Sequence, residues 1–278
     1  VAIDGNEALF SLIGTTYGGD GTISFGLPDF GGRIVVGTGL GAGLTQRFAG
    51  DLFGANQLSL TQSNLPTASG GEGVGMDNSQ ESAATNYLIR VEGSFLGGPG
   101  STPLAGIVQF AGSFVPDGYL RCEGQILQIA NNQGLFSLIG TTYGGNGTTT
   151  FALPDLRGRS PVGTDASHLL GQAGGSATLT PTLAQMPTDM GGSGQPISNE
   201  QPYLGLNFLI ATQGTFPPID GGGAPSDGHY VGEIIAYAGS TIPSGFLRCE
   251  GQVLQIAGNE ALFSLIGTTY GGNGTTTF

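Results

Sequence analysis

One ten-residue segment, Phe-Ser-Leu-Ile-Gly-Thr-Thr-Tyr-Gly-Gly, occurs three times in this 278-residue chain, at Phe10–Gly19, Phe136–Gly145 and Phe263–Gly272. The copies start 126 and then 127 residues apart. A solenoid repeat has roughly 20–50 residues, so this period is too long for one, and it matches the usual size of a domain. The chain is therefore a tandem array in which each repeat is long enough for its own hydrophobic core.

The array is cut inside a repeat at both ends. Residues 1–25 align with residues 254–278. We expect residues 1–103 to be a first repeat without its opening strands, residues 104–230 to be a complete second repeat, and residues 231–278 to be the opening part of a third. Because the third segment has the parts that the first lacks, three arrangements are open: closure within one chain, a head-to-tail contact with a neighbouring chain, or a window of a longer array.

The composition excludes several classes of function. The chain has 54 Gly, a net charge of −13, and no Lys, since its seven basic residues are all Arg. Without Lys there is no Schiff-base chemistry and no P-loop lysine, and without a basic stripe neither nucleic acid nor an anionic membrane surface is an expected partner. No apolar run approaches the roughly 18 residues of a transmembrane helix, so we predict no membrane span.

The middle repeat shows a clear order of elements. Residues 131–139 have apolar side chains at helical spacing, with Asn132 placed to cap the start and Gly140 to end the helix. Thr180 and the Pro after it predict a second short helix that ends at Pro187, and its copy is residues 60–66. Linkers are expected at residues 94–103 and 217–228, and short strands at residues 86–93, 106–112, 119–122, 126–129, 148–151, 177–179 and 206–214.

Several motifs follow one another in fixed order: Phe-Ala-Gly-x-Phe-x-Pro-x-Gly-Tyr (110–119), Cys-Glu-Gly-Gln (122–125), the ten-residue segment, Leu-Pro-Asp-Leu-Arg-Gly-Arg (153–159) and Leu-Asn-Phe-Leu-Ile-Ala-Thr-Gln-Gly (206–214). This series resembles the phage tail collar domain family, which includes the bacterial proteins usually labelled microcystin-dependent proteins. The resemblance covers the middle repeat and both partial ones. It implies a mainly β fold with a few short helices and Gly-rich loops, in extracellular or virion fibres that serve attachment and are not enzymes.

One part of the family pattern is missing. Many family members carry His-x-His after the second short helix, where it can hold a metal between chains. This chain has Met186-Pro-Thr-Asp-Met and Leu65-Pro-Thr-Ala-Ser at those positions. The resemblance therefore does not extend to an interchain zinc site.

The loop Tyr-Gly-Gly-Asp/Asn-Gly-Thr recurs in all three repeats and has two interpretations. Asp20, Asn146 and Asn273 have side-chain oxygens of the kind that bind Ca²⁺. Alternatively the loop is a tight turn, because Gly and Asn both accept positive φ. Since two copies have the neutral Asn in place of Asp, we favour the turn and predict no cofactor, with calcium as the alternative.

The motif Leu-Pro-Asp-x-x-Gly-Arg places a carboxylate four residues before a guanidinium. The two pairs are Asp29 with Arg33 and Asp155 with Arg159. The second copy of the motif also contains Arg157, where the first copy has Gly31. Such a pair can bind a sugar or an acidic ligand bidentately. It can also hold a loop in place by binding backbone carbonyls, and we favour this structural use.

Cys122 and Cys249 occupy the same position in two repeats. One Cys per repeat excludes a disulfide within a repeat, and we interpret both as buried structural thiols, with an inter-repeat bridge as the alternative. His168 and His229 have no counterpart in the first repeat, and we expect both to be exposed in loops. The Gly-rich insertion at residues 70–82 is expected to be a solvated loop, with recognition as the alternative.

We therefore expect a non-enzymatic structural subunit of an extracellular or phage-like fibre that self-associates, with loops for attachment to a cell-surface glycan or receptor. A discrete receptor- or glycan-binding module of a phage tail fibre is the alternative. A carbohydrate-cleaving enzyme comes third, because the 20 acidic residues show no pair at a defined spacing.

Overall fold

The computed structural model describes residues 1–31, 33–55, 61–80, 82–92, 102–112, 115–193, 197, 199–217 and 229–278. Within these ranges the protein is mainly β, with three α-helices of seven residues each: α1 (Glu7–Ile13), α2 (Gln133–Ile139) and α3 (Glu260–Ile266). The expected fold class is confirmed. The two expected linkers, at 94–103 and 217–228, lie almost wholly outside the described residues.

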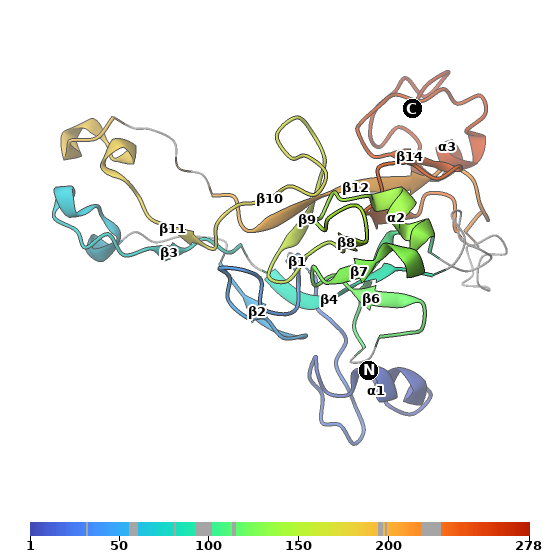
Figure 1. Ribbon diagram of the computed structural model, residues 1–278, viewed down its shortest axis with the longest axis horizontal. Coiled ribbons are helices and arrows are strands. Elements are labelled where there is room, and N and C mark those ends of the chain that lie inside the picture. The colour runs from blue at the N-terminus through green and yellow to red at the C-terminus, as the bar shows by residue number, and fades with distance from the viewer. Residues whose placement is uncertain are drawn as a thin grey trace.

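Ten strands form one sheet with the order β1-β4-β5-β13-β12-β10, in which β2 and β6 also pair with β4, and β9 and β14 also pair with β12. Figure 1 shows α1 and α3 on opposite sides of this body. The strands are β1 (Ile34–Gly37), β2 (Leu52–Phe53), β3 (Met76–Asp77), β4 (Ser82–Arg90), β5 (Gly106–Phe110), β6 (Tyr119–Arg121), β7 (Ile126–Gln128), β8 (Thr150–Ala152), β9 (Ser160–Gly163), β10 (Ala173–Gly174), β11 (Thr178–Leu179), β12 (Tyr203–Ala211), β13 (Ile234–Tyr237) and β14 (Phe246–Arg248).

Helix α2 lies close to its predicted position. Its apolar face, Leu135, Leu138 and Ile139, is buried in the main core. Gly140 ends the helix at φ 56°, a conformation that Gly adopts without steric cost. The prediction for Asn132 is wrong in one respect. Its side chain donates to the carbonyl of Gln128 at 3.0 Å and does not cap a helix N–H, because a 3₁₀ turn, η3 (Ile129–Asn131), precedes the helix.

The second predicted helix is a single 3₁₀ turn, η4 (Leu183–Gln185), and its N-cap residue is Thr182, not Thr180. The N–H of Thr182 donates to Oε1 of Gln185 at 2.7 Å. The prediction was wrong because the two Pro residues at 181 and 187 leave too short a stretch for α-helical hydrogen bonds. The first-repeat copy, η1 (Gln62–Asn64), is also one 3₁₀ turn, and residue 60 of the expected copy lies outside the described residues.

β3 and β11 pair antiparallel and lead into an arm that extends away from the sheet, at the left of Figure 1. Each half of the arm ends in two 3₁₀ turns, η1 and η2 (Thr67–Ser69) from the first repeat and η4 and η5 (Thr188–Met190) from the second. Asn78 joins the halves, because its Nδ2 donates to the carbonyls of Ser176 at 3.1 Å and Glu200 at 3.2 Å. Part of the insertion at 70–82 is therefore a paired strand and not a solvated loop.

The three helices carry the same Phe-Ser-Leu-Ile sequence but differ in burial. Leu138 of α2 is 4% exposed, whereas its counterpart in α3, Leu265, is 38% exposed. Leu9 of α1 is exposed, whereas its counterpart Leu135 is buried. The main core therefore lies around α2, which is covered by both its own repeat and the neighbouring ones.

Candidate functional site at the repeat junctions

Each of the two longest strands is shared by two repeats. The first half of β4 pairs with β1 and β2 of its own repeat, and its second half pairs with β5 and β6 of the next repeat. β12 pairs in the same way with β9 and β10, and then with β13 and β14. The repeats are therefore joined by main-chain hydrogen bonds as well as by the connecting chain.

The two junctions have the same register. Asn86 of β4 lies opposite Phe110 of β5, and its counterpart Asn207 lies opposite Tyr237, the counterpart of Phe110. β5 and β13 also pair with each other, so the two junctions meet in the middle of the sheet. The two junctions in the described part of the chain thus use the same strand register.

A buried Asn side chain fixes each junction. Nδ2 of Asn207 donates to the carbonyl of Gly239 at 2.8 Å, and its Oδ1 accepts from the Thr164 hydroxyl at 3.0 Å. Asn86 makes the equivalent bond to the carbonyl of Gly112 at 2.9 Å. The two Asn residues are 2% and 3% exposed. Sequence reasoning missed both, although an Asn inside a buried apolar strand signals a polar partner elsewhere in the fold.

The Tyr of the ten-residue segment also crosses the junction. The Tyr143 hydroxyl donates to the carbonyl of Ala238 at 2.9 Å, and Tyr17 donates to the carbonyl of Ala111 at 3.3 Å. Burial raises the pKa of both tyrosines, which keeps the hydroxyls protonated as donors. The third copy, Tyr270, is 82% exposed. Two of the three copies therefore have a junction partner in the described structure.

Asp20, Asn146 and Asn273 act as turn residues. Oδ1 of Asp20 accepts the N–H groups of residues 22–24 at 2.8–2.9 Å, and the Asn residues accept those of residues 148–150 and 275–277 in the same way. These N–H groups, that of Ile23 above all, hold the pKa of Asp20 well below its usual range. The described residues contain no cluster of three acidic, His or Cys side chains that could hold a metal.

The Asp–Arg pairs differ between the repeats. Asp29 forms an ion pair with Arg33, as the spacing predicts. Asp155 instead pairs bidentately with Arg157, whose Nε and Nη2 donate at 2.8 Å each, so the pairing expected with Arg159 is wrong. The turn that places the N–H of Arg157 on Oδ1 of Asp155 brings this side chain closer. Burial alone would raise the pKa of the Asp155 carboxyl. The hydrogen bonds and the charge of Arg157 lower this pKa by more than burial raises it, so the net shift is downward.

The Asp155–Arg157 loop lies against the first repeat. The N–H of Gly37 donates to the carbonyl of Arg159 at 3.0 Å, and the N–H of Gly158 donates to the carbonyl of Gly37 at 2.8 Å. A Cβ on Gly37 would come within 2.0 Å of the carbonyl oxygen of Leu156. Only Gly permits this approach, so the loop belongs to the seam between the repeats.

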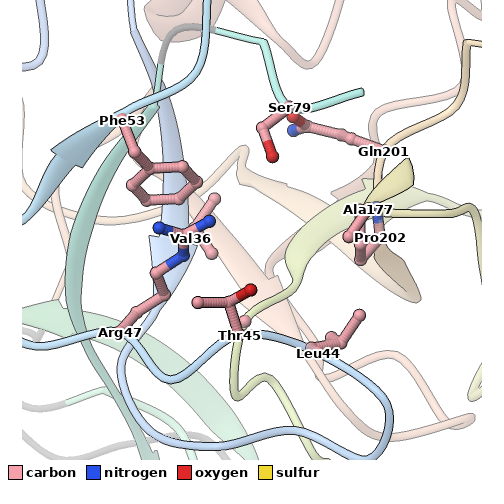
Figure 2. A pocket seen from close by; sticks show the side chains of 10 residues that line it. Val36, Leu44, Thr45, Arg47, Phe53, Ser79, Ala177, Gln201 and Pro202 are labelled. Atoms are coloured by element: carbon pink, nitrogen blue, oxygen red, sulfur yellow. The ribbon is translucent and has the colours of Figure 1, made fainter. Parts of the chain in front are cut away.

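A small pocket in the same seam is lined by residues of both repeats, and Figure 2 shows it. The Arg47 guanidinium lies over the ring of Phe53, 3.4 Å from its centroid. The pocket volume of about 20 Å³ holds about one water molecule and no sugar ring. We interpret this pocket as a packing gap between the repeats.

Cys122 and Cys249 are both free thiols. Cys122 lies in the main core, where burial raises its pKa and makes it inert. The interpretation as a buried thiol is wrong for Cys249, which is exposed. The reason is that Leu153–Leu156 cover Cys122, whereas no described segment packs over Cys249 in the same way.

The histidines are less exposed than expected. His229 is buried, with its ring edge-on to Phe246 at 4.9 Å and its Nδ1 3.4 Å from Oε2 of Glu233. His168 is partly buried, and its ring lies 5.0 Å from that of Tyr203. The expectation of exposed histidines was wrong because both rings pack against aromatic side chains of the sheet.

No helix among the described residues combines the length and the apolar character needed to cross a membrane.

Comparison with known proteins identifies the repeat. A sequence profile of the phage tail collar domain matches residues 1–35, 105–161 and 232–278, together half of the chain. Each matched segment contains one copy of the ten-residue motif and its helix. No curated protein and no solved structure matches the chain. The chain belongs to the phage tail collar domain family.

Proposed function

We propose that this chain is a non-enzymatic structural subunit of an extracellular or phage-like fibre, and that its copies associate head to tail. The observation that carries the proposal is the shared strand. The second halves of β4 and β12 find their partners in the next repeat, with the same register both times. A pairing that works identically at two successive junctions is suited to continue between molecules, and repeated head-to-tail contacts that do not close give a filament.

The first and last helices support this proposal. Leu9 of α1 and Leu265 of α3 are exposed, whereas α2 buries the equivalent side chains against neighbouring repeats. Tyr270 is exposed too, whereas Tyr143 donates across a junction. Both ends of the described structure thus present apolar surfaces that the middle repeat covers, and association would remove them from water.

The pockets give no support to carbohydrate cleavage. A glycosidase needs two carboxyl groups about 5–9.5 Å apart on either side of the bond to be cleaved. Two pockets among the described residues, of about 300 and 240 Å³, have no such pair: the smaller is lined by the single carboxylate Glu123, and the larger by none. A structural role fits these surfaces better than catalysis does.

Negative-stain electron microscopy and sedimentation velocity over a range of protein concentrations test the fibre. We expect filaments of uniform width and a series of growing species as the concentration rises. Monomers or trimers at every concentration would contradict the fibre and favour a discrete binding module.

A second function, attachment to a glycan or receptor, has its own supporting observation in the projecting arm of Figure 1. Leu183 and Met190 are exposed on its 3₁₀ turns. We expect the double substitution Leu183→Asp and Met190→Asp to reduce binding to cells or to a glycan array without changing the sedimentation profile. Unchanged binding by this variant would exclude the arm as the attachment surface.

A further inference from the structure

Two strands from different repeats end at the same point of the sheet. β1 of the first repeat runs parallel to β4, and the N–H of Thr38, just after β1, donates to the carbonyl of Thr85 at 3.0 Å. β6 of the second repeat runs antiparallel to β4, and the N–H of Cys122, just after β6, donates to the carbonyl of Tyr87 at 2.9 Å. Because carbonyls two residues apart on a strand face the same edge, the carboxyl ends of β1 and β6 meet there, and both chains turn away from the sheet.

A polar pocket of about 240 Å³ lies at this meeting point. Its volume is below the roughly 300–1,000 Å³ of pockets for drug-sized ligands, so it suits one small ring. Both repeats contribute to its lining, which includes Thr38, Gln46, Arg47 and Phe48 from the first repeat and Arg121 and Glu123 from the second.

Hydrogen bonds hold the polar side chains of this pocket in place. Oδ1 of the buried Asn86 accepts from the Thr38 hydroxyl at 2.6 Å and from Nη1 of Arg121. The Arg47 guanidinium is held over the ring of Phe53 (Figure 2), and among the described residues it has no ion-pair partner. Side chains that are already positioned lose less conformational entropy when a ligand binds.

The lining combines three kinds of group that a sugar ring can use together. Phe48 is 61% exposed and offers an apolar face for the C–H groups of the ring. A hydroxyl group can accept from the Arg121 guanidinium and can donate to the Glu123 carboxylate. A ligand with a carboxylate of its own would be repelled by Glu123 and by the net charge of −13. The pocket therefore favours a neutral ligand rich in hydroxyl groups.

We propose that this pocket binds a neutral sugar unit at the junction of the first and second repeats. The apolar face of the sugar packs on Phe48, and its hydroxyls bind Arg121 and Glu123. This site is additional to the proposed structural role, and it depends neither on the projecting arm nor on filament formation.

The second junction provides a comparison within the same chain. It has the same polar residue types, with the Thr164 hydroxyl bonded to Asn207 at 3.0 Å. Its Arg248 forms an ion pair with Glu250 at 3.4 Å, so these two charges already face each other. We therefore assign the sugar site to the first junction, where Arg47 adds a second guanidinium to the lining.

Saturation-transfer NMR on the full chain tests the site. The neutral probes are the methyl glycosides of mannose, glucose and galactose, and glucuronic acid is the acidic probe. We expect a neutral probe to bind and Phe48→Ala to weaken its binding about five- to tenfold, because the substitution removes apolar area that the sugar ring buries. Glu123→Gln should weaken it about fivefold, because a hydrogen bond to a charged acceptor is about twice as strong as one to a neutral acceptor.

Ile126→Ala is the matched control, because Ile126 is 57% exposed and lies outside the lining, and it should leave the affinity unchanged. Binding of none of the neutral probes, or of glucuronic acid alone, overturns the proposal. Neutral binding that survives both pocket substitutions places the sugar elsewhere and also overturns it. The arm variant with Leu183→Asp and Met190→Asp should bind the probe like the wild type, and a loss confined to that variant would assign sugar binding to the arm instead. Sugar binding by material that never forms filaments supports this site and contradicts only the fibre.

Discussion

Replacement of Asn207 by Ala removes the side chain that fixes the second junction. The substitution leaves the buried carbonyl of Gly239 without its 2.8 Å donor and the hydroxyl of Thr164 without its 3.0 Å acceptor. A buried polar group that loses its partner costs about 1–3 kcal/mol, and the partly exposed Thr164 can turn to water. We therefore expect the free energy of unfolding to fall by about 1–3 kcal/mol, a large share of the roughly 5–15 kcal/mol of a typical domain.

Urea unfolding gives the total loss, and hydrogen exchange locates it. Protection should fall first in β13, whose partner strand contains Asn207, and less in β1, which pairs with β4. Asn199→Ala, at an exposed position, is the matched control and should change stability by less than about 0.5 kcal/mol. If N207A also stays within about 0.5 kcal/mol of the wild type, or loses protection evenly over the sheet, the buried Asn does not hold the junction.

Three further predictions concern single positions. Tyr143→Phe should lower the free energy of unfolding, measured in urea, by about 1–2 kcal/mol, because it leaves a junction carbonyl without its donor. The control Tyr270→Phe should have no effect in dilute protein, because Tyr270 is exposed. Equal effects of the two substitutions would contradict the junction role of Tyr143. Gly134→Ala should stabilise α2 by about 0.5–1 kcal/mol in thermal unfolding, because Ala costs less backbone entropy than Gly inside a helix. The other two helices have Ala at this position, and the added Cβ would lie at an ordinary contact distance of 3.4 Å from a methyl group of Leu104. A loss of stability would show that this space is not available. Asp20→Asn should be nearly neutral at pH 7. The pKa of Asp20 is lower in the folded protein than in the unfolded chain, where it is near 4. The stability that this difference gives is present above about pH 4 and is lost as the pH falls through the folded pKa. The Asn variant has no such group to protonate, so its melting temperature should fall less than that of the wild type below about pH 4.

Local patterns in the sequence predicted the local elements well. Helix α2 was predicted because its apolar spacing and Gly140 depend only on neighbouring residues. The start of β12 was predicted at residue 206, but the strand begins at Tyr203. Gly205 looks like an interruption of the apolar run, yet a Cβ there would come within 2.2 Å of the Leu169 carbonyl, so the strand needs this Gly.

Contacts between distant residues could not be predicted in the same way. The pairing of β12 with β13 requires knowledge of which repeat supplies each partner, and the period alone leaves that open. The roles of Asn86 and Asn207 depend on this pairing, and so does the different exposure of Cys122 and Cys249. The Asp155 pairing was missed for a local reason: spacing favoured Arg159, but the turn presents both the N–H and the side chain of Arg157 to the carboxylate.

The shared strands place the unit of gene duplication and the unit of folding out of phase. Inserting or deleting one whole period changes the length of the protein without creating a new kind of contact, because the two junctions that the structure describes have the same register. Because of the shared strands, a fragment that ends at the end of a period loses strands that pair with its last long strand, and we expect this loss to lower its stability. We expect a fragment of residues 104–217 to melt at a lower temperature than one extended to residue 248, which retains β13 and β14, and equal melting temperatures would show that each period folds without its successor.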